Sequence, residues 1–173
     1  LSAARRSFAA AQDDRWKLVS HSKWQPSHVF RALRAAKAAL LPETRTFDGT
    51  VIPAPHLRYG GKYFRRDEDF VRSGEKEADR LTNRLGVHSG SRVLEVGCGP
   101  GRLAIGILRR LPDLLAYRAV DVDRAAIRWC QRHIQSARPA FQFVHLDVAN
   151  TRYNPAGSTH GNELRLPFED DSF

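Results

Sequence analysis

A glycine-rich stretch marks the place where this sequence could hold a ligand. Residues 93–101 read Val-Leu-Glu-Val-Gly-Cys-Gly-Pro-Gly, so glycine recurs at Gly97, Gly99 and Gly101. Glycine lets a chain turn sharply from a strand into a helix, and its missing side chain lets a ligand lie against the backbone. The helix that follows supplies backbone N–H groups without intrahelical partners. We therefore expect a ligand at this turn, and Cys98 is small enough to allow its close approach.

Acidic residues near this stretch indicate what the ligand carries. Glu95 lies inside the stretch, and Asp121 ends the next predicted strand, 24 residues after Gly97. A carboxylate in the position of Asp121 can accept hydrogen bonds from both hydroxyls of a ribose. Asp121 therefore predicts an adenosine ligand without choosing between NAD and S-adenosylmethionine. It disfavours NADP, because a carboxylate would repel the 2′-phosphate.

A third acidic residue, Asp147, ends the third predicted strand. In this position a carboxylate can accept a hydrogen bond from the exocyclic amine of adenine, while Val122 and Val148 offer apolar contacts to the faces of the ring. The alternative is that Asp147 is only a cap or turn residue before the polar loop 149–163.

The spacing of the glycines separates the two candidate ligands. A nicotinamide or flavin dinucleotide site expects G-x-G-x-x-G. Here Arg102 stands in the third glycine position and would crowd the pyrophosphate. An acidic residue beside the loop, Glu95, suits the ammonium group of S-adenosylmethionine. The pattern favours S-adenosylmethionine and leaves an NAD-binding oxidoreductase as the alternative.

Strand and helix patterns alternate around the loop. The expected strands cover residues 92–96, 117–122 and 141–146, and the expected helices cover 68–85, 102–111 and a segment after Asp123. This alternation predicts an α/β fold, with a Rossmann-like parallel sheet and flanking helices in a three-layer sandwich. A helix from Ser27 to residue 40 and an extended proline- and glycine-rich connector over 42–66 make residues 1–66 an N-terminal extension. Residues 67–173 then form the ligand-binding domain.

Four segments together resemble the class I S-adenosylmethionine-dependent methyltransferases: residues 93–101, 117–123, 141–147 and 166–173. The sequence is particularly similar to a small bacterial group with a Tyr-Asn-Pro-x-Gly loop, which is Tyr153–Gly157 here. The resemblance implies direct methyl transfer to an O, N or C atom of an acceptor, most simply a small molecule. It implies that the glycine loop lies under the methionine moiety, Asp121 binds the ribose, and Asp147 and Val148 flank adenine. It breaks off at Phe173, so we expect the N-terminal half of the domain, truncated before its fourth strand.

Composition limits the other functions. A non-catalytic module that binds an adenosine ligand or nucleic acid is a weaker alternative. Only the net charge of +9 favours it, and the basic residues are interspersed rather than clustered. No apolar run of membrane length and no signal-peptide pattern occur. Two cysteines without a disulfide pattern indicate a reduced, cytoplasmic setting. No spacing typical of metal ligands occurs. The absence of methionine, together with the polar turn over residues 169–173 that should lead into another strand, suggests a fragment cut at both ends.

No residue stands out as a catalytic acid, base or nucleophile. This fits methyl transfer, in which the main task of the protein is to align the acceptor with the methyl group. Tyr59, Gly60 and Gly61 either fold over the ligand or form a plain linker, and the sequence favours neither. The acceptor and the oligomeric state are not specified by the sequence.

Overall fold

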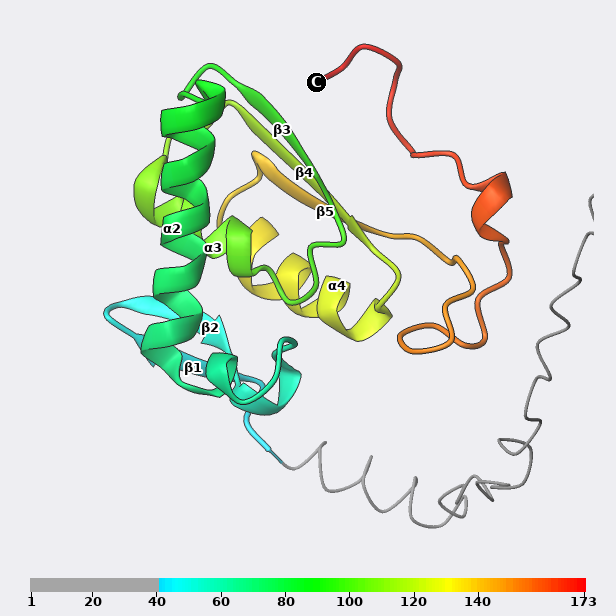
Figure 1. Ribbon diagram of the computed structural model, residues 1–173, viewed down its shortest axis with the longest axis horizontal. Helices are drawn as coiled ribbons and strands as arrows, with labels where there is room; N and C mark the ends of the chain where they lie inside the picture. Colours follow the sequence, from blue (N-terminus) through cyan, green and yellow to red (C-terminus); the bar gives the residue numbers. More distant parts are fainter. Residues whose placement is uncertain (1–40) are drawn as a thin grey trace, which may run out of the picture. The chain divides into compact units, whose positions relative to one another are not determined.

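Three parallel strands form the sheet that carries the predicted loop (Figure 1). The computed structural model describes residues 41–173, so the helix expected from Ser27 to residue 40 lies outside the described residues. The strands β3 (Arg92–Val96), β4 (Ala116–Asp121) and β5 (Phe141–His145) follow the order β3-β4-β5. The three predicted strands are thus confirmed to within one residue at each end. Since the strands are parallel, their carboxyl ends meet at one edge of the sheet.

Two crossover helices cover one face of the sheet. Helix α3 (Arg102–Arg110) joins β3 to β4, and α4 (Arg124–Cys130), continued by the π-helical turn η3 (Gln131–Gln135), joins β4 to β5. Both right-handed crossovers step in the same direction, which puts both helices on the same face. Their isoleucines share one apolar cluster with aromatic side chains of the sheet: Ile105, Ile107, Ile127, Ile134, Tyr117, Phe141 and Phe143. This confirms the Rossmann-like α/β arrangement with flanking helices, of which residues 41–173 supply the sheet and one helical layer.

Asp123 begins α4 as predicted. Its Oδ1 accepts hydrogen bonds from the backbone N–H groups of Ala125 at 2.8 Å and Ala126 at 3.0 Å. A side-chain cap of this kind stabilises a helix by about 1 kcal/mol.

Helix α2 (Asp67–Leu85) packs against α3 with the two backbones in direct contact. A Cβ atom on Gly106 would lie 2.1 Å from the carbonyl oxygen of Gly74, and a Cβ atom on Gly74 would lie 2.3 Å from that of Arg102. A side chain at either position would therefore force the helices apart. Helix α2 ends at Leu85 as predicted, and Gly86 follows it in the left-handed conformation with a φ of 69°.

An antiparallel hairpin precedes α2, where the sequence predicts an extended connector. Strand β1 (Thr44–Phe47) pairs with β2 (Thr50–Pro53), and the turn residues Asp48 and Gly49 have φ values of 48° and 70°. Two positive φ values are what a two-residue type I′ turn requires, and Asp-Gly is a preferred pair for it. The hairpin corrects the prediction for residues 42–66. The prolines do not break the segment: they end β2 and begin the 3₁₀ turn η1 (Pro55–Leu57), and a second turn, η2 (Tyr63–Arg65), leads into α2.

This hairpin belongs to the main core. Ile52 and Ala54 are buried, and Phe47, Leu57 and Phe64 pack against the same apolar cluster as the sheet. The described residues, 41–173, all belong to one unit by their contacts. The predicted boundary between residues 66 and 67 therefore falls inside a packed unit.

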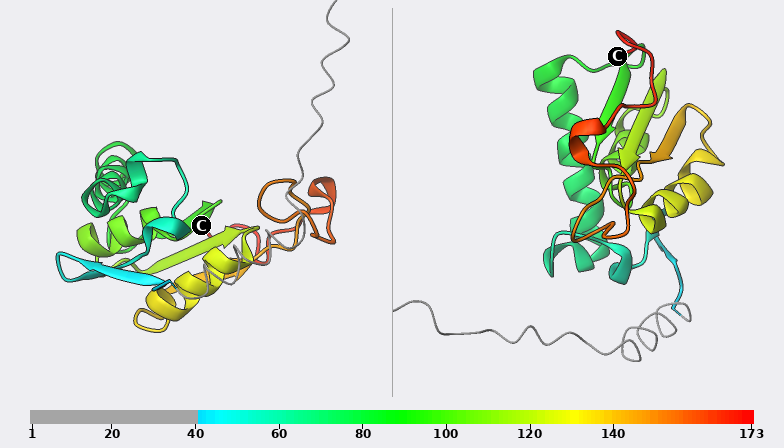
Figure 2. Two further views of the ribbon diagram at one scale, coloured as in Figure 1. Left: turned by 90° about the horizontal axis from the view of Figure 1, so that it is seen from below. Right: turned by 90° about the vertical axis from the view of Figure 1, so that its right-hand side faces the viewer.

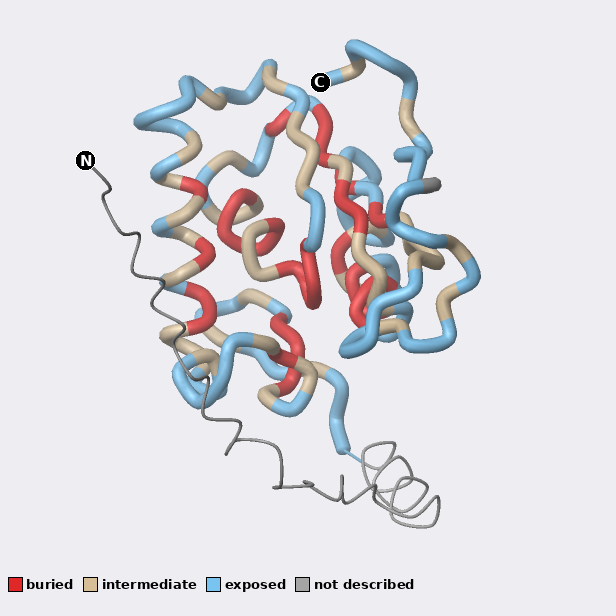
Figure 3. Tube along the Cα trace, turned by 45° about the vertical axis from the view of Figure 1, so that its right-hand side comes forward, coloured by how far each residue is buried: buried red, intermediate tan, exposed pale blue. Residues whose placement is uncertain are grey.

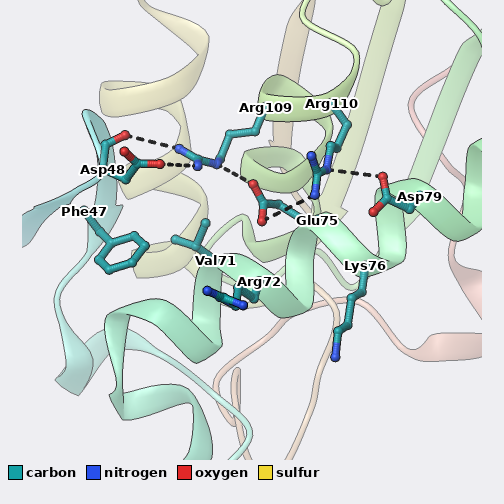
Figure 4. Close-up of a pocket in the computed structure, with 9 residues that line it drawn as sticks. All are labelled: Phe47, Asp48, Val71, Arg72, Glu75, Lys76, Asp79, Arg109 and Arg110. Atoms are coloured by element: carbon teal, nitrogen blue, oxygen red, sulfur yellow. Dashed lines mark hydrogen bonds and ion pairs between the residues drawn. The ribbon is translucent and has the colours of Figure 1, made fainter.

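Arg109 of α3 ties the hairpin to the helices (Figure 4). Its guanidinium donates to Oε1 of Glu75 at 2.7 Å, to Oγ1 of Thr50 at 2.6 Å and to Oδ2 of Asp48 at 2.7 Å. We call these four residues the hairpin clasp. Three residues of the clasp, Asp48, Glu75 and Arg109, line a surface cavity of about 510 Å³ between the hairpin, α2 and α3.

The chain after β5 is mostly exposed, whereas buried residues gather in the strands and in α3 (Figure 3). It forms a polar loop and the short turn η4 (Gly161–Glu163). Residues 165–173 border a cavity of about 580 Å³ together with Leu94, on the side of the sheet away from α2 and α3 (Figure 2). Among residues 41–173, no helix has both the length and the apolar character needed to cross a membrane.

Candidate functional site

The glycine loop connects β3 to α3 in the conformation that its sequence predicts. Gly97, Gly99 and Gly101 have φ values of 85°, 50° and 80°, which residues with side chains rarely adopt. The backbone N–H groups of Gly97 and Cys98 donate to the carbonyl oxygen of Val120 at 2.8 and 3.2 Å. The loop is therefore anchored to the end of β4, directly beside Asp121.

Asp121 joins the ends of the two strands. Its Oδ2 accepts from the backbone N–H of Gly99 at 2.6 Å, and its Oδ1 accepts from the backbone N–H of Asp123 at 2.8 Å. A carboxylate offers about four acceptor positions in all. Roughly two of them remain for the hydroxyl groups of a ligand, so Asp121 can hold the loop and a ribose at the same time.

Glu95 lies at the same edge, on the side of the sheet that the helices cover. The hydroxyl of Tyr117 donates to its Oε2. Burial raises the pKa of the Glu95 carboxyl above its ordinary value, against the opposing effects of the Tyr117 hydrogen bond and of Arg102. A cation bound beside a buried carboxyl favours its charged form. Glu95 therefore suits the ammonium group of an amino-acid ligand.

Aromatic residues from the segment before α2 and from the first turn of α2 cover the glycine loop. Tyr59, Phe64 and Phe70 surround a cavity of about 230 Å³ together with Glu95 and the loop. A Cβ atom on Gly99 would lie 3.1 Å from the ring of Tyr59. Of the two possibilities for residues 59–61, the structure shows the one in which they fold over the loop.

A buried arginine holds this cover in place. The side chain of Arg58 is 0% exposed and donates to Oδ1 of Asp67 at 2.7 Å. It also donates to the carbonyl oxygens of Pro53 at 2.7 Å and Phe64 at 3.1 Å, and it lies 4.8 Å from the ring centroid of Phe70. Sequence reasoning missed Arg58. Its only signal was a single basic residue between prolines and glycines, where no periodicity indicates burial.

Tyr59 also connects the glycine loop to two further elements. Its hydroxyl donates to Oδ2 of Asp123, and its ring centroid lies 5.1 Å from that of Tyr153, with the rings tilted by 45°. Burial and the neighbouring Asp123 raise the pKa of the Tyr59 hydroxyl. The hydroxyl thus remains a donor at neutral pH, and Tyr153 brings the Tyr-Asn-Pro-x-Gly loop to the site.

Asp147, Val122 and Val148 lie at the same edge, after β5 and β4. Both oxygens of Asp147 are bonded within its own loop: Oδ1 accepts from Nδ2 of Asn154 at 3.0 Å, and Oδ2 accepts from Oγ of Ser158 at 2.7 Å. These hydrogen bonds lower the pKa of Asp147. The geometry is that of a turn residue, the alternative that the sequence left open. Val122 and Val148 are both partly buried.

Cys98 and Cys130 are both buried free thiols. Sγ of Cys130 donates to the carbonyl oxygen of Gly99 at 3.7 Å. Contact with Cys130 and burial raise the pKa of the Cys98 thiol, so Cys98 is a small packing residue in the loop and not a nucleophile. Within the range 41–173, no three His, Cys, Asp or Glu side chains gather in an arrangement that could hold a metal ion.

Known proteins resemble this part of the chain in sequence. A family model described as a methyltransferase domain matches residues 93–161, which include the glycine loop, Asp121 and Tyr153. The match of residues 93–161 to a methyltransferase domain agrees with the resemblance that the sequence indicates.

Three relatives extend this comparison. Phthiotriol/phenolphthiotriol dimycocerosates methyltransferase 1 of Mycobacterium ulcerans is 39% identical over 106 residues, which cover 58% of this chain and 32% of that protein. A phthiotriol/phenolphthiotriol dimycocerosates methyltransferase from Mycobacterium leprae is 34% identical over 85 residues, which cover 49% of this chain and 25% of that protein. An uncharacterised protein of Haemophilus influenzae is 31% identical over 100 residues, covering 58% and 34%. The matched part of this chain thus spans a quarter to a third of each relative.

Proposed function

We propose that this chain binds S-adenosylmethionine at the carboxyl edge of the sheet and is part of an enzyme that methylates a small molecule. One observation carries this proposal: the Asp121 carboxylate accepts a hydrogen bond from the backbone N–H of Gly99 in the glycine loop and still has acceptor positions open for a ligand. The match of residues 93–161 to a methyltransferase domain supports the same ligand.

The side chains present fit the parts of S-adenosylmethionine. Glu95 supplies a partly buried carboxyl for the ammonium group. Nothing lies within 4 Å of a Cβ atom placed on Gly97, so a methionine moiety can approach the loop there. Asp121 suits the ribose hydroxyls. Adenine is then directed towards Val122 and Val148, at the ends of the next two strands.

S-adenosylmethionine supplies an electrophilic methyl group, so the protein has to bind, orient and shield rather than activate. Glu95 and Asp121 hold the two polar ends of the ligand at a set distance, because both side chains belong to neighbouring parallel strands. Tyr59 and Phe64 cover the cavity beside Glu95 and reduce the access of water. No side chain of this chain needs to exchange a proton with the methyl group during transfer.

We propose a small-molecule acceptor because the mycobacterial relatives are named for phthiotriol and phenolphthiotriol dimycocerosates. Within residues 41–173, both cysteines are free and buried, which supports a cytoplasmic setting for the activity.

Titration calorimetry with S-adenosylhomocysteine tests the proposal. We expect the full chain to bind this product and Asp121→Ala to bind it at least about 10-fold more weakly, because hydrogen bonds to a charged group contribute about 1.5–3 kcal/mol. Asp113→Ala, at an exposed position after α3, is the matched control. Absence of binding to the unmodified chain would refute the proposal, and binding of NADH in its place would restore the oxidoreductase alternative.

A further inference from the structure

The loop after β5 is tied at its base by Asp147. The carbonyl oxygen of Asp147 accepts from the backbone N–H of Thr159 at 3.0 Å, and the N–H of Ala149 donates to the carbonyl oxygen of Thr159 at 2.8 Å. The carboxylate adds its bonds to Asn154 and Ser158. The chain thus returns to its own starting point, and we call residues 147–159 the platform loop.

Two asparagines and a glycine shape the rest of the platform loop. The backbones of Asn150 and Asn154 exchange hydrogen bonds of 2.9 and 3.0 Å, and Oδ1 of Asn150 accepts from the N–H groups of Arg152 and Tyr153 at 3.0 and 2.9 Å. A Cβ atom on Gly157 would lie 2.5 Å from the backbone nitrogen of Ala149. The loop therefore has one closely bonded conformation, with Tyr153 at its tip.

Tyr153 is placed against the candidate site by this conformation. Its ring packs on Tyr59, which itself lies against Gly99 and bonds Asp123. The guanidinium of Arg152 lies 5.1 Å from the centroid of the Tyr153 ring, and 36% of the residue remains exposed. A partly exposed aromatic ring at the edge where Asp121 ends is suited to stacking on a base.

We propose that the platform loop is a preformed aromatic wall for the adenosine end of the ligand, in which Tyr153 stacks on the purine and Asp147 is a positioning residue. Asp147 acts through Asn154 and Ser158, instead of accepting a hydrogen bond from the adenine amine. This inference rests on the proposed binding of S-adenosylmethionine. It changes the role of Asp147 from a direct adenine contact to a residue that positions the platform loop.

The two roles of Asp147 differ in how they depend on the purine. A direct contact to the amine distinguishes adenine from hypoxanthine, whereas a positioning role affects both bases equally. We would measure by calorimetry the affinities of S-adenosylhomocysteine, 5′-methylthioadenosine and 5′-methylthioinosine, the last of which lacks the amine. The variants are Tyr153→Ala, Tyr153→Phe, Asp147→Ala and the double variant Asn154→Ala/Ser158→Ala, with Asp113→Ala as the control.

We expect Tyr153→Ala to weaken all three ligands about 10-fold, since stacking on an aromatic ring contributes about 1–3 kcal/mol per base. Tyr153→Phe should retain the affinity. Asp147→Ala and the double variant should weaken both purines by the same factor, and trypsin should cut more rapidly after Arg152 in both.

Two results would overturn the inference while leaving the proposed function intact. One is unchanged affinity in Tyr153→Ala. The other is an Asp147→Ala variant that loses its preference for adenine over hypoxanthine while the double variant binds normally. If the unmodified chain binds none of the three ligands, the proposed function itself fails, and the inference fails with it.

Discussion

The ammonium group of the ligand would need Glu95 in its charged form, whereas burial in the folded protein favours the neutral form. The charge that binding requires therefore lowers the stability of the fold. Its pKa is raised in the folded protein by burial, so the folded chain holds a proton that the unfolded chain has already released. The free energy of unfolding therefore falls as the pH rises from about 4.3, the ordinary pKa of glutamate, through the raised pKa of the folded state.

Glu95→Gln should remove this dependence. We expect the variant to be more stable than the unmodified chain at pH 7 and equally stable near pH 4, because glutamine keeps an acceptor for Tyr117 and carries no charge. Urea unfolding at the two pH values measures the difference. Binding of S-adenosylhomocysteine should weaken in the same variant, and equal stability at pH 7 would contradict the expectation.

Gly101 and Gly61 offer a matched pair for separating backbone strain from packing. Both have a φ of 80°, but a Cβ atom on Gly101 would lie 3.0 Å from Sγ of Cys130 and from Cδ1 of Ile134, whereas nothing lies within 4 Å of one on Gly61. We expect Gly61→Ala to cost about 1 kcal/mol, from backbone strain alone. Gly101→Ala should cost about 1–3 kcal/mol more, from overpacking. Urea unfolding measures both, and equal losses would show that α4 yields to the added methyl group.

The residues of the site were predictable in part. Glu95, the glycines and Asp121 were found because they follow one another along a strand–loop–helix–strand pattern, whose parallel connections bring them to one edge. Arg58 was not found, and for Tyr59 the sequence left a cover and a plain linker equally open, because both residues reach the loop only through the packing of a separate segment on α2. The direction of the Asp147 side chain depends on Asn154 and Ser158, which no periodic pattern places.

At the scale of elements, the hairpin clasp connects pieces that are far apart in the sequence. We expect Arg109→Ala to lower the free energy of unfolding by about 1–3 kcal/mol, because hydrogen bonds between charged groups are lost. Amide hydrogen exchange of residues 44–53 should accelerate more than that of β3 to β5. The measurement is exchange followed by mass spectrometry.

Arg80→Ala is the control for this variant. Arg80 pairs with Glu77 at 3.0 Å on the exposed side of α2, and such pairs contribute roughly 0–1 kcal/mol. Equal effects of the two variants, or no change in exchange in the hairpin, would mean that the clasp does not hold it.

The hairpin was missed although its signal was present. Asp48-Gly49 is flanked by Thr-Arg-Thr-Phe and Thr-Val-Ile-Pro, which are strand-forming residues on both sides of a preferred turn pair. The prolines and glycines over residues 42–66 favour an extended connector, and the hairpin pattern is too short to outweigh them. The strands and helices from residue 67 to 145 were predictable because their longer apolar patterns agree with their caps, as at Asp123 and Gly86.

For the whole molecule, ligand binding should appear as added stability. We expect S-adenosylhomocysteine at 100 times its dissociation constant to raise the free energy of unfolding by about 2.7 kcal/mol. NADH at the same concentration should leave it unchanged. Unfolding in urea with and without each ligand measures this, and stabilisation by NADH alone would contradict it.

The contact between Gly74 and Gly106 restricts how this fold can change over generations. In most helix pairs, a larger residue on one helix can be accommodated by a smaller one on the other. Here both partners already lack a side chain, so no smaller residue exists to compensate. Substitutions at Gly74 and Gly106 therefore cannot be compensated one at a time. The distance between α2 and α3 behind the glycine loop should stay the same as the sequence evolves.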